Sequence, residues 1–358
     1  MSLAEYRKKV DAVDDQILRL LQQRIELSKK IGQVKRQSSL PIHDQRRESR
    51  ILNRVRGVGR RIGFDPHELE AVYRRILTVS RQVQGEDLKI AYLGPRGTFC
   101  EQAARTHFRD QPATYTEKSS IADVFRSVDA KEEDFGVVPV ENSIEGSVNI
   151  TLDLLFEFDL KVYGEIEGRI RHNLLSRPET SIRDVGVILS HPQALAQCRR
   201  FIESNLPNAE LREESSTARA AQKARRMKGS AAIGTELAAD IYGMTILARG
   251  IENTRDNYTR FFVLSHRSAE PTGRDKTSII YSIPHAPGSL QRSLEIFARR
   301  GINLTKIESR PMQKAPWEYF FYCDFEGHLK DRKYAEALKE FEKKCALLKV
   351  LGSYPRAR

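Results

Sequence analysis

Long apolar runs are missing from this sequence, and so is any spacing of cysteines that would form a cross-linked or metal-bound framework. No apolar run approaches the ~20 residues that a membrane-spanning helix needs. The four cysteines are scattered without a C-x-x-C pair, which argues against disulfides or a zinc site and suits a reducing cytoplasm. The opening residues MSLAEYRKKV contain no apolar core and no small-residue cleavage site, so we expect a protein that is not secreted.

Low-complexity tracts and internal repeats are also absent, and the charge is unevenly distributed. The 358 residues are enough for two or three domains, each with its own core. Residues 1–85 hold 19 Lys and Arg against 10 Asp and Glu, a net charge of +9, whereas the whole chain carries +12. A basic first quarter fits either nucleic acid or a small substrate with several carboxylates.

Residues 1–86 have the apolar spacing of a helical domain. In the first third of this segment, apolar side chains recur every three or four positions, which predicts an uninterrupted helix of ~33 residues, about 50 Å long. This apolar stripe consists of Leu3, Tyr6, Val10, Val13, Ile17, Leu20, Leu27, Ile31 and Val34. Three helices of which one is so long make a poor core by themselves, so we expect an intertwined homodimer or a higher homo-oligomer.

The ends of these three helices are marked by turn-forming residues. The first helix is expected to stop near Pro41, and a second to run from about Asp44 to Arg56, where glycines at 57, 59 and 63 loosen the chain. Asp65 and Pro66 are an N-cap and a first-turn residue, so they predict a third helix that continues through Gln84.

The remaining chain divides into two further segments. Residues 88–267 alternate short apolar runs with helical patterns, which predicts an α/β domain with a mostly parallel sheet and ligands at strand ends and helix N-termini. Residues 275–355 follow the order β-α-β-β-α-β, which predicts a ferredoxin-like domain.

One cation interrupts the apolar stripe of the first helix. Arg24 occupies a position of this stripe. Burying a guanidinium without a partner costs on the order of several kcal/mol. It is either paired with an acidic residue on a neighbouring helix or there to meet an anionic ligand. Lys35 lies eleven residues on and shares its face, whereas Arg7 is ~25 Å away along the axis and would reach the same site only from a partner chain.

The polar residues of the helical segment resemble, in order and spacing, the active site of the all-helical chorismate mutases. The matching residues are Arg7, Arg24, Lys35, Asp44, Arg47, Glu48, Ser80 and Gln84. The resemblance implies that Lys35 and Gln84 flank the breaking ether oxygen, that Arg7, Arg24 and Arg47 bind carboxylates, and that Glu48 takes the ring hydroxyl. For Ser80, the alternative is a hydroxyl that bonds back to the preceding turn of its helix.

The strand-like run Phe261–Leu264 is entered through Thr259 and Arg260, a hydroxyl beside a guanidinium. Taken alone, these are a β-branched residue at the start of a strand and a surface charge. Together with the loops GPRGTF, PVENSIEGSV, SHPQALAQC and ESSTARAA, however, their order and spacing resemble prephenate dehydratase over residues 88–267.

That resemblance implies two α/β lobes like those of periplasmic binding proteins, with the triplet Thr259, Arg260 and Phe261 in the cleft between them. Thr259 would protonate the departing hydroxyl of prephenate, and Arg260 would support the anion. The other residues expected in the cleft are Glu141, Asn142, Ser143, His191, Gln193, Ser216 and Thr217. Cys100 stands where the family has a serine, and a thiol is a weaker hydrogen-bond donor.

The last segment resembles an ACT regulatory domain. Two stretches carry the likeness, Gly288, Ser289 and Leu290 in the first and Glu308, Ser309, Arg310 and Pro311 in the second. In dehydratases such turns bind L-phenylalanine as a feedback inhibitor, so the resemblance implies an allosteric site here. Ser289 replaces the usual alanine. The alternative is a ferredoxin-like domain without a ligand.

Together these resemblances cover nearly the whole chain and imply the bifunctional family of phenylalanine biosynthesis, with chorismate and prephenate as substrates and no cofactor, nucleic acid or membrane. A rival is a ligand-sensing transcriptional regulator with a basic helical DNA-binding N-terminus. Helix-turn-helix units use short helices, whereas the first helix here is long and its cation lies on the apolar stripe. A third possibility is a dehydratase whose mutase domain has decayed to a dimer clamp, but its polar set is intact.

Overall fold

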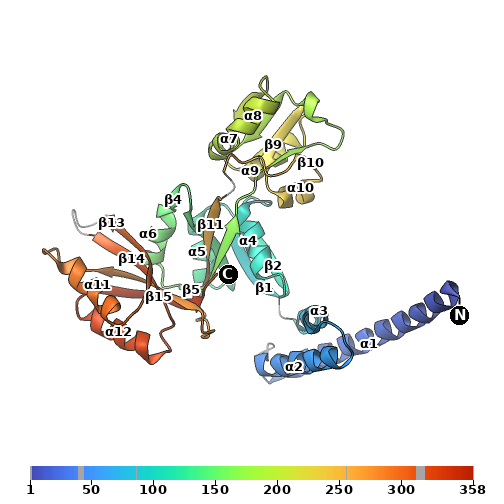
Figure 1. The fold of residues 1–358 in the computed structure, drawn as a ribbon, viewed down its shortest axis with the longest axis horizontal. Coiled ribbons are helices and arrows are strands. Elements are labelled where there is room, and N and C mark those ends of the chain that lie inside the picture. Colours follow the sequence, from blue (N-terminus) through green and yellow to red (C-terminus); the bar gives the residue numbers. More distant parts are fainter. Residues whose placement is uncertain (1, 39–43, 86, 255, 312–318, 358) are drawn as a thin grey trace. The chain divides into compact units, whose positions relative to one another are not determined.

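The computed structural model describes residues 2–38, 44–85, 87–254, 256–311 and 319–357. It forms two compact units, of which the first comprises the residues up to Leu88 with His107–Thr114, and the second the rest. The first unit contains the three predicted helices, α1 (Leu3–Gln37), α2 (Gln45–Arg61) and α3 (Pro66–Gln82) (Figure 1). The predicted break at Pro41 lies outside the described residues.

The helix starts follow their caps, but one predicted end is wrong. Asp44 accepts a hydrogen bond from the backbone N–H of Arg47 (2.9 Å), and Asp65 caps α3 in the same way. Helix α2 continues past Arg56, so Gly57 and Gly59 are helical. A Cβ on Gly59 would lie 3.1 Å from the Cα of Pro66, so this glycine permits close packing where α3 begins instead of loosening the chain.

The apolar stripe of α1 is exposed in the single chain. Its side chains are 43–68% accessible from Leu3 to Val34. The C-terminal part of α1 does contact the end of α3, and there Gly32 is required. A Cβ on Gly32 would lie 2.7 Å from the Cα of Gln84, closer than atoms can approach.

Helices α2 and α3 are joined by a buried carboxylate that the sequence did not reveal. Glu70 is 5% exposed and accepts hydrogen bonds from Arg56 Nη2 (3.0 Å) and from Arg74 Nε (3.0 Å). The hydrogen bond from Arg56 is the main reason that the pKa of Glu70 falls to about 2, with Arg74 acting in the same direction. Glu70 is therefore charged at any ordinary pH.

The second unit contains two α/β lobes and a ferredoxin-like domain. The sheet of the first lobe has the order β2-β1-β3-β11-β5, with β4 paired to β3. Its strands are β1 (Leu88–Leu93), β2 (Ala113–Lys118), β3 (Phe135–Asn142), β4 (Gly146–Ser147), β5 (Lys161–Arg169) and β11 (Tyr258–Ser265), and its helices are α4 (Phe99–His107), α5 (Ile121–Asp129) and α6 (Asn149–Glu157).

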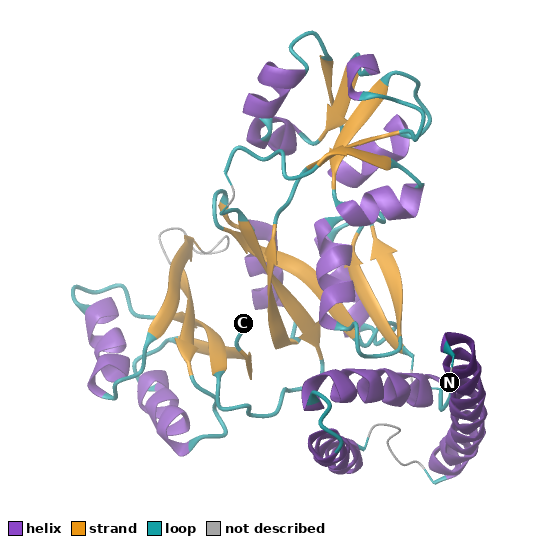
Figure 2. Cartoon of the chain, turned by 45° about the vertical axis from the view of Figure 1, so that its right-hand side comes forward, coloured by secondary structure: helices purple, strands orange, loops and turns teal. Residues whose placement is uncertain are grey.

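The second lobe has its own sheet, in the order β10-β6-β9-β7-β8. Helices α7 and α8 pack on one side of it and α9 and α10 on the other (Figures 1 and 2). The elements are β6 (Asn173–Ser176), a 3-10 turn (Ile182–Asp184), β7 (Val187–Ser190), α7 (Pro192–Gln197), α8 (Arg199–Asn205), β8 (Glu210–Glu213), α9 (Thr217–Ala224), β9 (Ser230–Gly234), α10 (Glu236–Tyr242) and β10 (Thr245–Ala248).

The prediction of two α/β lobes is confirmed, but the prediction of a mostly parallel sheet is wrong. Strand β1 runs parallel to β3, and β7 runs parallel to β8 and β9. In contrast, β11 is antiparallel to both neighbours, β3 and β5, and β6 is antiparallel to β9 and β10. Strand β11 returns to the first lobe after the chain has built the second, and an apolar run does not reveal the direction of its strand.

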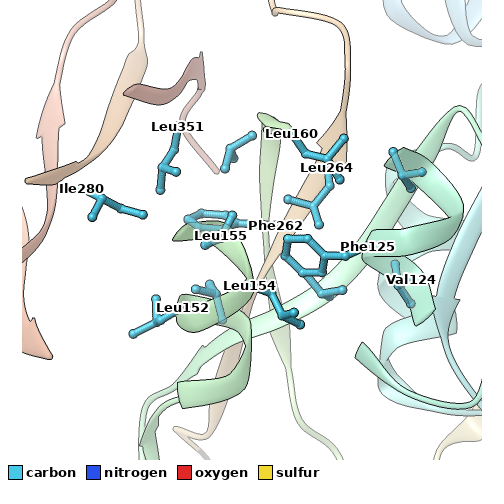
Figure 3. Close-up of a cluster of buried hydrophobic side chains, with 14 of the residues drawn as sticks. Val124, Phe125, Leu152, Leu154, Leu155, Leu160, Phe262, Leu264, Ile280 and Leu351 are labelled. Atoms are coloured by element: carbon cyan, nitrogen blue, oxygen red, sulfur yellow. The ribbon is translucent and has the colours of Figure 1, made fainter. Parts of the chain in front are cut away.

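The predicted ferredoxin-like order is confirmed, with strands in the order β13-β14-β12-β15. Its elements are β12 (Asp275–Ser282), α11 (Ser289–Arg299), β13 (Leu304–Pro311), β14 (Tyr319–Glu326), α12 (Arg332–Glu342) and β15 (Leu347–Pro355). Both helices cover one face. The other face adds Ile280 and Leu351 to a core that also contains Leu155 and Phe262 of the first lobe (Figure 3). Among the described residues, no helix is long and apolar enough to cross a lipid bilayer.

Candidate active sites

The helical domain brings Arg24 to the end of α3. The guanidinium of Arg24 is half-buried and donates to the hydroxyl of Ser80, which itself donates to the carbonyl of Ile76 (2.9 Å). Both interpretations of Ser80 therefore hold, since it bonds back to its own helix and also accepts from a cation. Arg24 makes no ion pair with a carboxylate in the described part of the chain.

Two further predicted residues lie in the turn after α3 and on α1. Gln84 is 8% exposed, and its side-chain amide donates to the carbonyl of Ser80 (2.8 Å). Lys35 is half-buried on α1. Glu48 on α2 is held by Arg81 Nη1, which lies 2.7 Å from both carboxylate oxygens. Arg81 was missed at the sequence level because one more arginine in a basic helix carries no distinguishing signal.

Three members of the predicted set do not converge with these residues within one chain. Arg7 is exposed near the start of α1, ~25 Å along the axis from Arg24 at 1.5 Å per residue. Asp44 is used as the N-cap of α2, and the side chain of Arg47 is exposed in the first turn of the same helix.

The second candidate site is a cavity of about 500 Å³ that is lined by residues of both α/β lobes. Seven of the predicted cleft residues line it, together with Cys100: Asn142, His191, Gln193, Ser216, Thr217, Thr259 and Phe261. Burial raises the pKa of the Cys100 thiol to about 12, so it stays protonated. Helices α4 and α9 begin at this cavity, at Phe99 and Thr217, and helix N-termini favour anions.

Asn142 fixes the Thr259 hydroxyl within the cavity. The Oδ1 of Asn142 accepts from the backbone N–H of Ile144 and of Glu145 (both 3.0 Å), which defines the orientation of the amide. Its Nδ2 therefore donates to Oγ1 of Thr259 (2.9 Å). Because Thr259 Oγ1 accepts this bond, the hydrogen of its own hydroxyl is available for a ligand.

A chain of polar side chains continues from Asn142 to the second lobe, and the sequence did not reveal it. Asn142 Nδ2 donates to Asn257 Oδ1 (2.8 Å), and Asn257 Nδ2 donates to Gln197 Oε1 (3.2 Å). His172 Nε2 also lies 2.9 Å from Gln197 Oε1. Burial lowers the pKa of His172, so the imidazole is neutral at pH 7 and donates through Nε2. In the described structure, His172 Nδ1 and Gln197 Nε2 have no partner, which leaves both for a ligand.

The expectation that Arg260 and Glu141 line the cleft is wrong. Arg260 Nη1 lies 2.6 Å from Asp324 Oδ2 of the ferredoxin-like domain, and Arg260 Nε lies 2.8 Å from Glu165 Oε2. Glu141 lies 3.0 Å from Lys306 Nζ, again a residue of the ferredoxin-like domain. Successive strand residues point to opposite faces, so the neighbours of Asn142 and Thr259 necessarily point away from the cavity.

Ser143 also lies outside the cavity lining. Its hydroxyl accepts from the backbone N–H of Tyr258 (3.0 Å) and its backbone N–H donates to the carbonyl of Tyr258 (2.8 Å). Ser143 therefore joins the end of β3 to the start of β11.

The predicted effector residues separate into two groups. Ser289 and Leu290 line a cavity of about 260 Å³, with Tyr319 and Phe321, and Gly288 precedes α11 with φ 77°, which glycine adopts without strain. The prediction of a turn at residues 308–311 is wrong, because they continue strand β13. Glu308 contacts the hydroxyl of Ser147, Arg310 pairs with Asp153 (2.8 Å), and Ser309 is exposed.

Family models match the first two of these regions, and a relative matches nearly the whole chain. A model of the prephenate dehydratase family matches residues 90–269, and a model of the chorismate mutase type II family matches residues 6–85. The chain is 46% identical to the bifunctional chorismate mutase/prephenate dehydratase of Aquifex aeolicus, over 99% of this chain and 98% of that one.

Solved structures resemble three quarters of the chain. The prephenate dehydratase of Arthrobacter aurescens, solved in complex with L-Phe, has a TM-score of 0.70 and 36% identity over 75% of this chain and 90% of that one. A protein described as a quorum-quenching acylase has a TM-score of 0.68 and 30% identity, over 75% of this chain and 97% of its own. Different activities are thus described for similar folds, so the full-length relative is better evidence of function than the fold is.

The chain belongs to the family of bifunctional chorismate mutase/prephenate dehydratases. Its two activities are an isomerase reaction in the helical domain and a lyase reaction in the two-lobed domain. The alternative of a transcriptional regulator is not favoured, because the basic helical segment matches the model of a chorismate mutase family.

Proposed function

We propose that the helical domain holds chorismate by its two carboxylates while the ether bond breaks, with no covalent step. Arg24 supports this role, because a guanidinium bonded to Ser80, with no ion pair to a carboxylate in the described residues, keeps its charge for an anion. Lys35 and Gln84 stabilise the charge that develops on the ether oxygen, and Glu48, oriented by Arg81, accepts the ring hydroxyl.

The same site requires a second copy of the chain. Arg7 lies too far along α1 to reach Arg24, whereas an antiparallel α1 from another protomer would supply the partner's Arg7. The exposed apolar stripe of α1 provides the surface that such a homodimer would bury. Arg47 is exposed in one chain and would bind a carboxylate in the completed site.

In the two-lobed domain, Thr259 protonates the departing hydroxyl of prephenate, which leaves as water while the ring carboxylate leaves as CO2. The electron pair of the broken C–C bond enters the ring, which becomes aromatic. One observation carries this assignment: Thr259 Oγ1 accepts from Asn142 inside the cavity, so its own hydrogen is directed to the substrate. Accepting that bond also makes the hydroxyl a better acid.

The carboxylates of prephenate are then held by neutral groups and not by Arg260. The N-termini of α4 and α9 supply backbone N–H groups and the positive end of the helix dipole. Ser216, Thr217, His191 and Gln193 add hydrogen bonds, as does the unpartnered Gln197 Nε2. Cys100 gives a weaker contact than the serine it replaces.

L-Phenylalanine inhibits the dehydratase by binding to the ferredoxin-like domain, which thereby acts as an ACT domain. The cavity lined by Ser289, Leu290 and Phe321 combines polar and apolar side chains, as an amino acid with an aromatic side chain requires. The dehydratase of Arthrobacter aurescens has been solved with L-Phe, which supports the same ligand here. The enzyme works in the cytoplasm, a reducing compartment that its scattered cysteines suit.

Two variants of the full-length enzyme test the division of labour. Arg24→Ala should stop the conversion of chorismate while it spares the dehydration of added prephenate. Thr259→Ala should lower the dehydratase kcat by about 10²–10⁴-fold and spare the mutase. Arg19→Ala removes an exposed arginine of the same helix and serves as the control. If both variants lose both activities, the two-site scheme is wrong.

A further inference from the structure

Strands β3 and β11 carry two adjacent cross-strand pairs that face opposite sides of the sheet. Thr259 pairs with Asn142, and both line the cavity. Arg260 pairs with Glu141, and both face the ferredoxin-like domain. The backbone that positions the reacting hydroxyl is therefore continuous with an arginine that contacts another domain.

Three strands of the second unit converge on the guanidinium of Arg260, whose side chain is only 10% exposed. Its Nε donates to Glu165 on β5 (2.8 Å), its Nη1 to Asp324 on β14 (2.6 Å), and its Nη2 to the hydroxyl of Tyr354 on β15 (3.1 Å). The guanidinium carbon also lies 4.8 Å from the ring centroid of Phe262. Each of the three guanidinium nitrogens thus has a hydrogen-bond acceptor, which fixes the orientation of the group.

Asp324 is the partner that balances the charge of Arg260. Glu165 is already shared with Lys276, whose Nζ lies 2.9 Å from Glu165 Oε1. The side chains of Glu165 and Asp324 are 0% and 6% exposed. Without the charge of Asp324, Arg260 and Lys276 would share Glu165, which is unfavourable for buried cations in a medium of low dielectric constant. The other carboxylate near Arg260 is that of Glu141, 3.8 Å from Nη1, and it also pairs with Lys306.

The hydrogen-bonded ladder between β11 and β3 is irregular next to Arg260. The position of this part of β11 therefore depends more strongly on side-chain contacts. Arg260 pairs with Glu141, but the next residue, Phe261, pairs with Pro139, which leaves a bulge at Val140. Proline has no N–H to donate to the ladder. Bulges next to active sites commonly redirect a side chain. Only two pairs of this ladder lie beyond the bulge, those of Arg260 and Thr259.

We propose that Arg260 is a positioning residue of the dehydratase, held by Asp324 and Tyr354 of the ferredoxin-like domain so that the Thr259 hydroxyl is directed at the substrate. The inference rests on the proposed role of Thr259 as proton donor. It makes the ferredoxin-like domain part of the dehydratase site, because two of the three hydrogen-bonding side chains around Arg260 come from it. A movement of β14 or β15 would then displace the hydroxyl without any contact to the substrate.

The test uses the full-length enzyme with Asp324→Asn, which keeps the shape of the side chain and removes its charge. Since a misplacement of about 1 Å costs up to ~10²-fold, the dehydratase kcat should fall by about 10- to 100-fold with KM within about twofold. The mutase activity is the internal control for folding. Arg267→Gln is the matched variant, because Arg267 pairs with Asp134 (3.0 Å) next to the same two strands at their other end, and it should change neither constant.

A double-mutant cycle separates positioning from general damage. If Arg260 and Asp324 act through one contact, the combined variant Arg260→Gln with Asp324→Asn loses no more kcat than Arg260→Gln alone. The proposal is wrong if the kcat losses of the two single variants multiply in the combined variant, or if only KM changes. Tyr354→Phe removes one hydroxyl and carries the test if Asp324→Asn does not fold, with an expected loss of about three- to tenfold in kcat.

Thr259→Ala, measured beside these variants, distinguishes the two levels of the argument. If Thr259→Ala is inactive and both Asp324→Asn and Tyr354→Phe retain full kcat, the positioning role of Arg260 is wrong and the proton donor stands. If Thr259→Ala retains activity, the proposed donor is wrong, and with it the premise of this inference.

Discussion

The two proposed sites of this chain would meet dicarboxylates of similar size with different side chains. The helical site presents charges, with Arg24, Lys35 and Glu48 on helices that are partly open to solvent. The dehydratase cavity presents hydroxyls, amides and a neutral imidazole, while the charged neighbours Glu141 and Arg260 are turned to the opposite face of the sheet. The rearrangement needs charged groups that hold and polarise its substrate. The dehydration instead needs one proton delivered to the oxygen of the departing hydroxyl.

The largest expected effect on this difference between the sites concerns the hydrogen bond that orients Thr259 in the dehydratase cavity. Asn142→Asp replaces a donor by an acceptor, so the Thr259 hydroxyl would turn toward the carboxylate and away from the substrate. We expect the dehydratase kcat to fall by about 10²–10³-fold, within the range for a lost general acid. Steady-state rates with prephenate measure the effect. Ser143→Ala alters the adjacent residue outside the cavity lining and should stay within a few fold of the wild type.

The helical site depends on the close approach of α1 to the end of α3. In Gly32→Ala, the new Cβ would lie 2.7 Å from the Cα of Gln84, so the two segments must separate. We expect a loss of about 10- to 100-fold in mutase kcat, as for a misplaced catalytic group, with no change in the dehydratase.

Gly57→Ala is the matched control for this change. It is also a helical glycine of the same domain, but nothing lies within 4 Å of its added Cβ. It should stabilise the domain by about 0.5–1 kcal/mol, since alanine is the better helix former. Equal mutase activity in both variants would show that the contact with Gln84 does not position the site.

Acid should affect the helical domain through Glu70. Its pKa is about 2 in the folded protein and about 4.3 in a free chain. Its stabilising contribution is complete above the unfolded pKa and is lost as the pH falls from about 4.5 toward 2. Glu70→Gln should destabilise the domain by about 1–3 kcal/mol at pH 7 and flatten this part of the pH profile. Thermal melts of both proteins between pH 2 and 7 would measure it, and parallel profiles would contradict the assignment.

The smallest expected effect concerns Cys100. Cys100→Ser replaces the thiol by a hydroxyl, a stronger hydrogen-bond donor, at the N-terminus of α4. The dehydratase kcat/KM should rise by about two- to fivefold, the order of part of one neutral hydrogen bond. Since the thiol pKa is about 12, activity between pH 6 and 9 should not reflect its ionisation. An unchanged kcat/KM would show that residue 100 does not contact the substrate.

Much of this architecture follows from local chemistry that a sequence displays. Asp44 and Asp65 mark helix starts because a cap acts within a few residues, and the alternation of elements in the last domain gives its order directly. The position of Thr259 in a cavity follows from its resemblance to the dehydratases. None of these needs knowledge of which distant strands meet.

The features that the sequence did not reveal depend on contacts between residues that are far apart in the chain. The face taken by Arg260 is set by the register of β11 on β3, and its partner Asp324 comes from a domain 64 positions further on. His172 and Gln197 are separated by 25 residues and become a pair only when the second lobe closes its sheet. Glu70 looks like any surface carboxylate until α2 and α3 pack.

The exposed apolar face of α1 has a consequence for how this enzyme behaves on dilution. The dehydratase cavity is lined by a single chain, so its occupancy should be independent of how much protein is present. If a second α1 completes the mutase site, as proposed, the number of complete sites obeys mass action and falls as dilution separates the dimer into protomers. The ratio of the two turnover rates would thus report the association constant, without any hydrodynamic measurement.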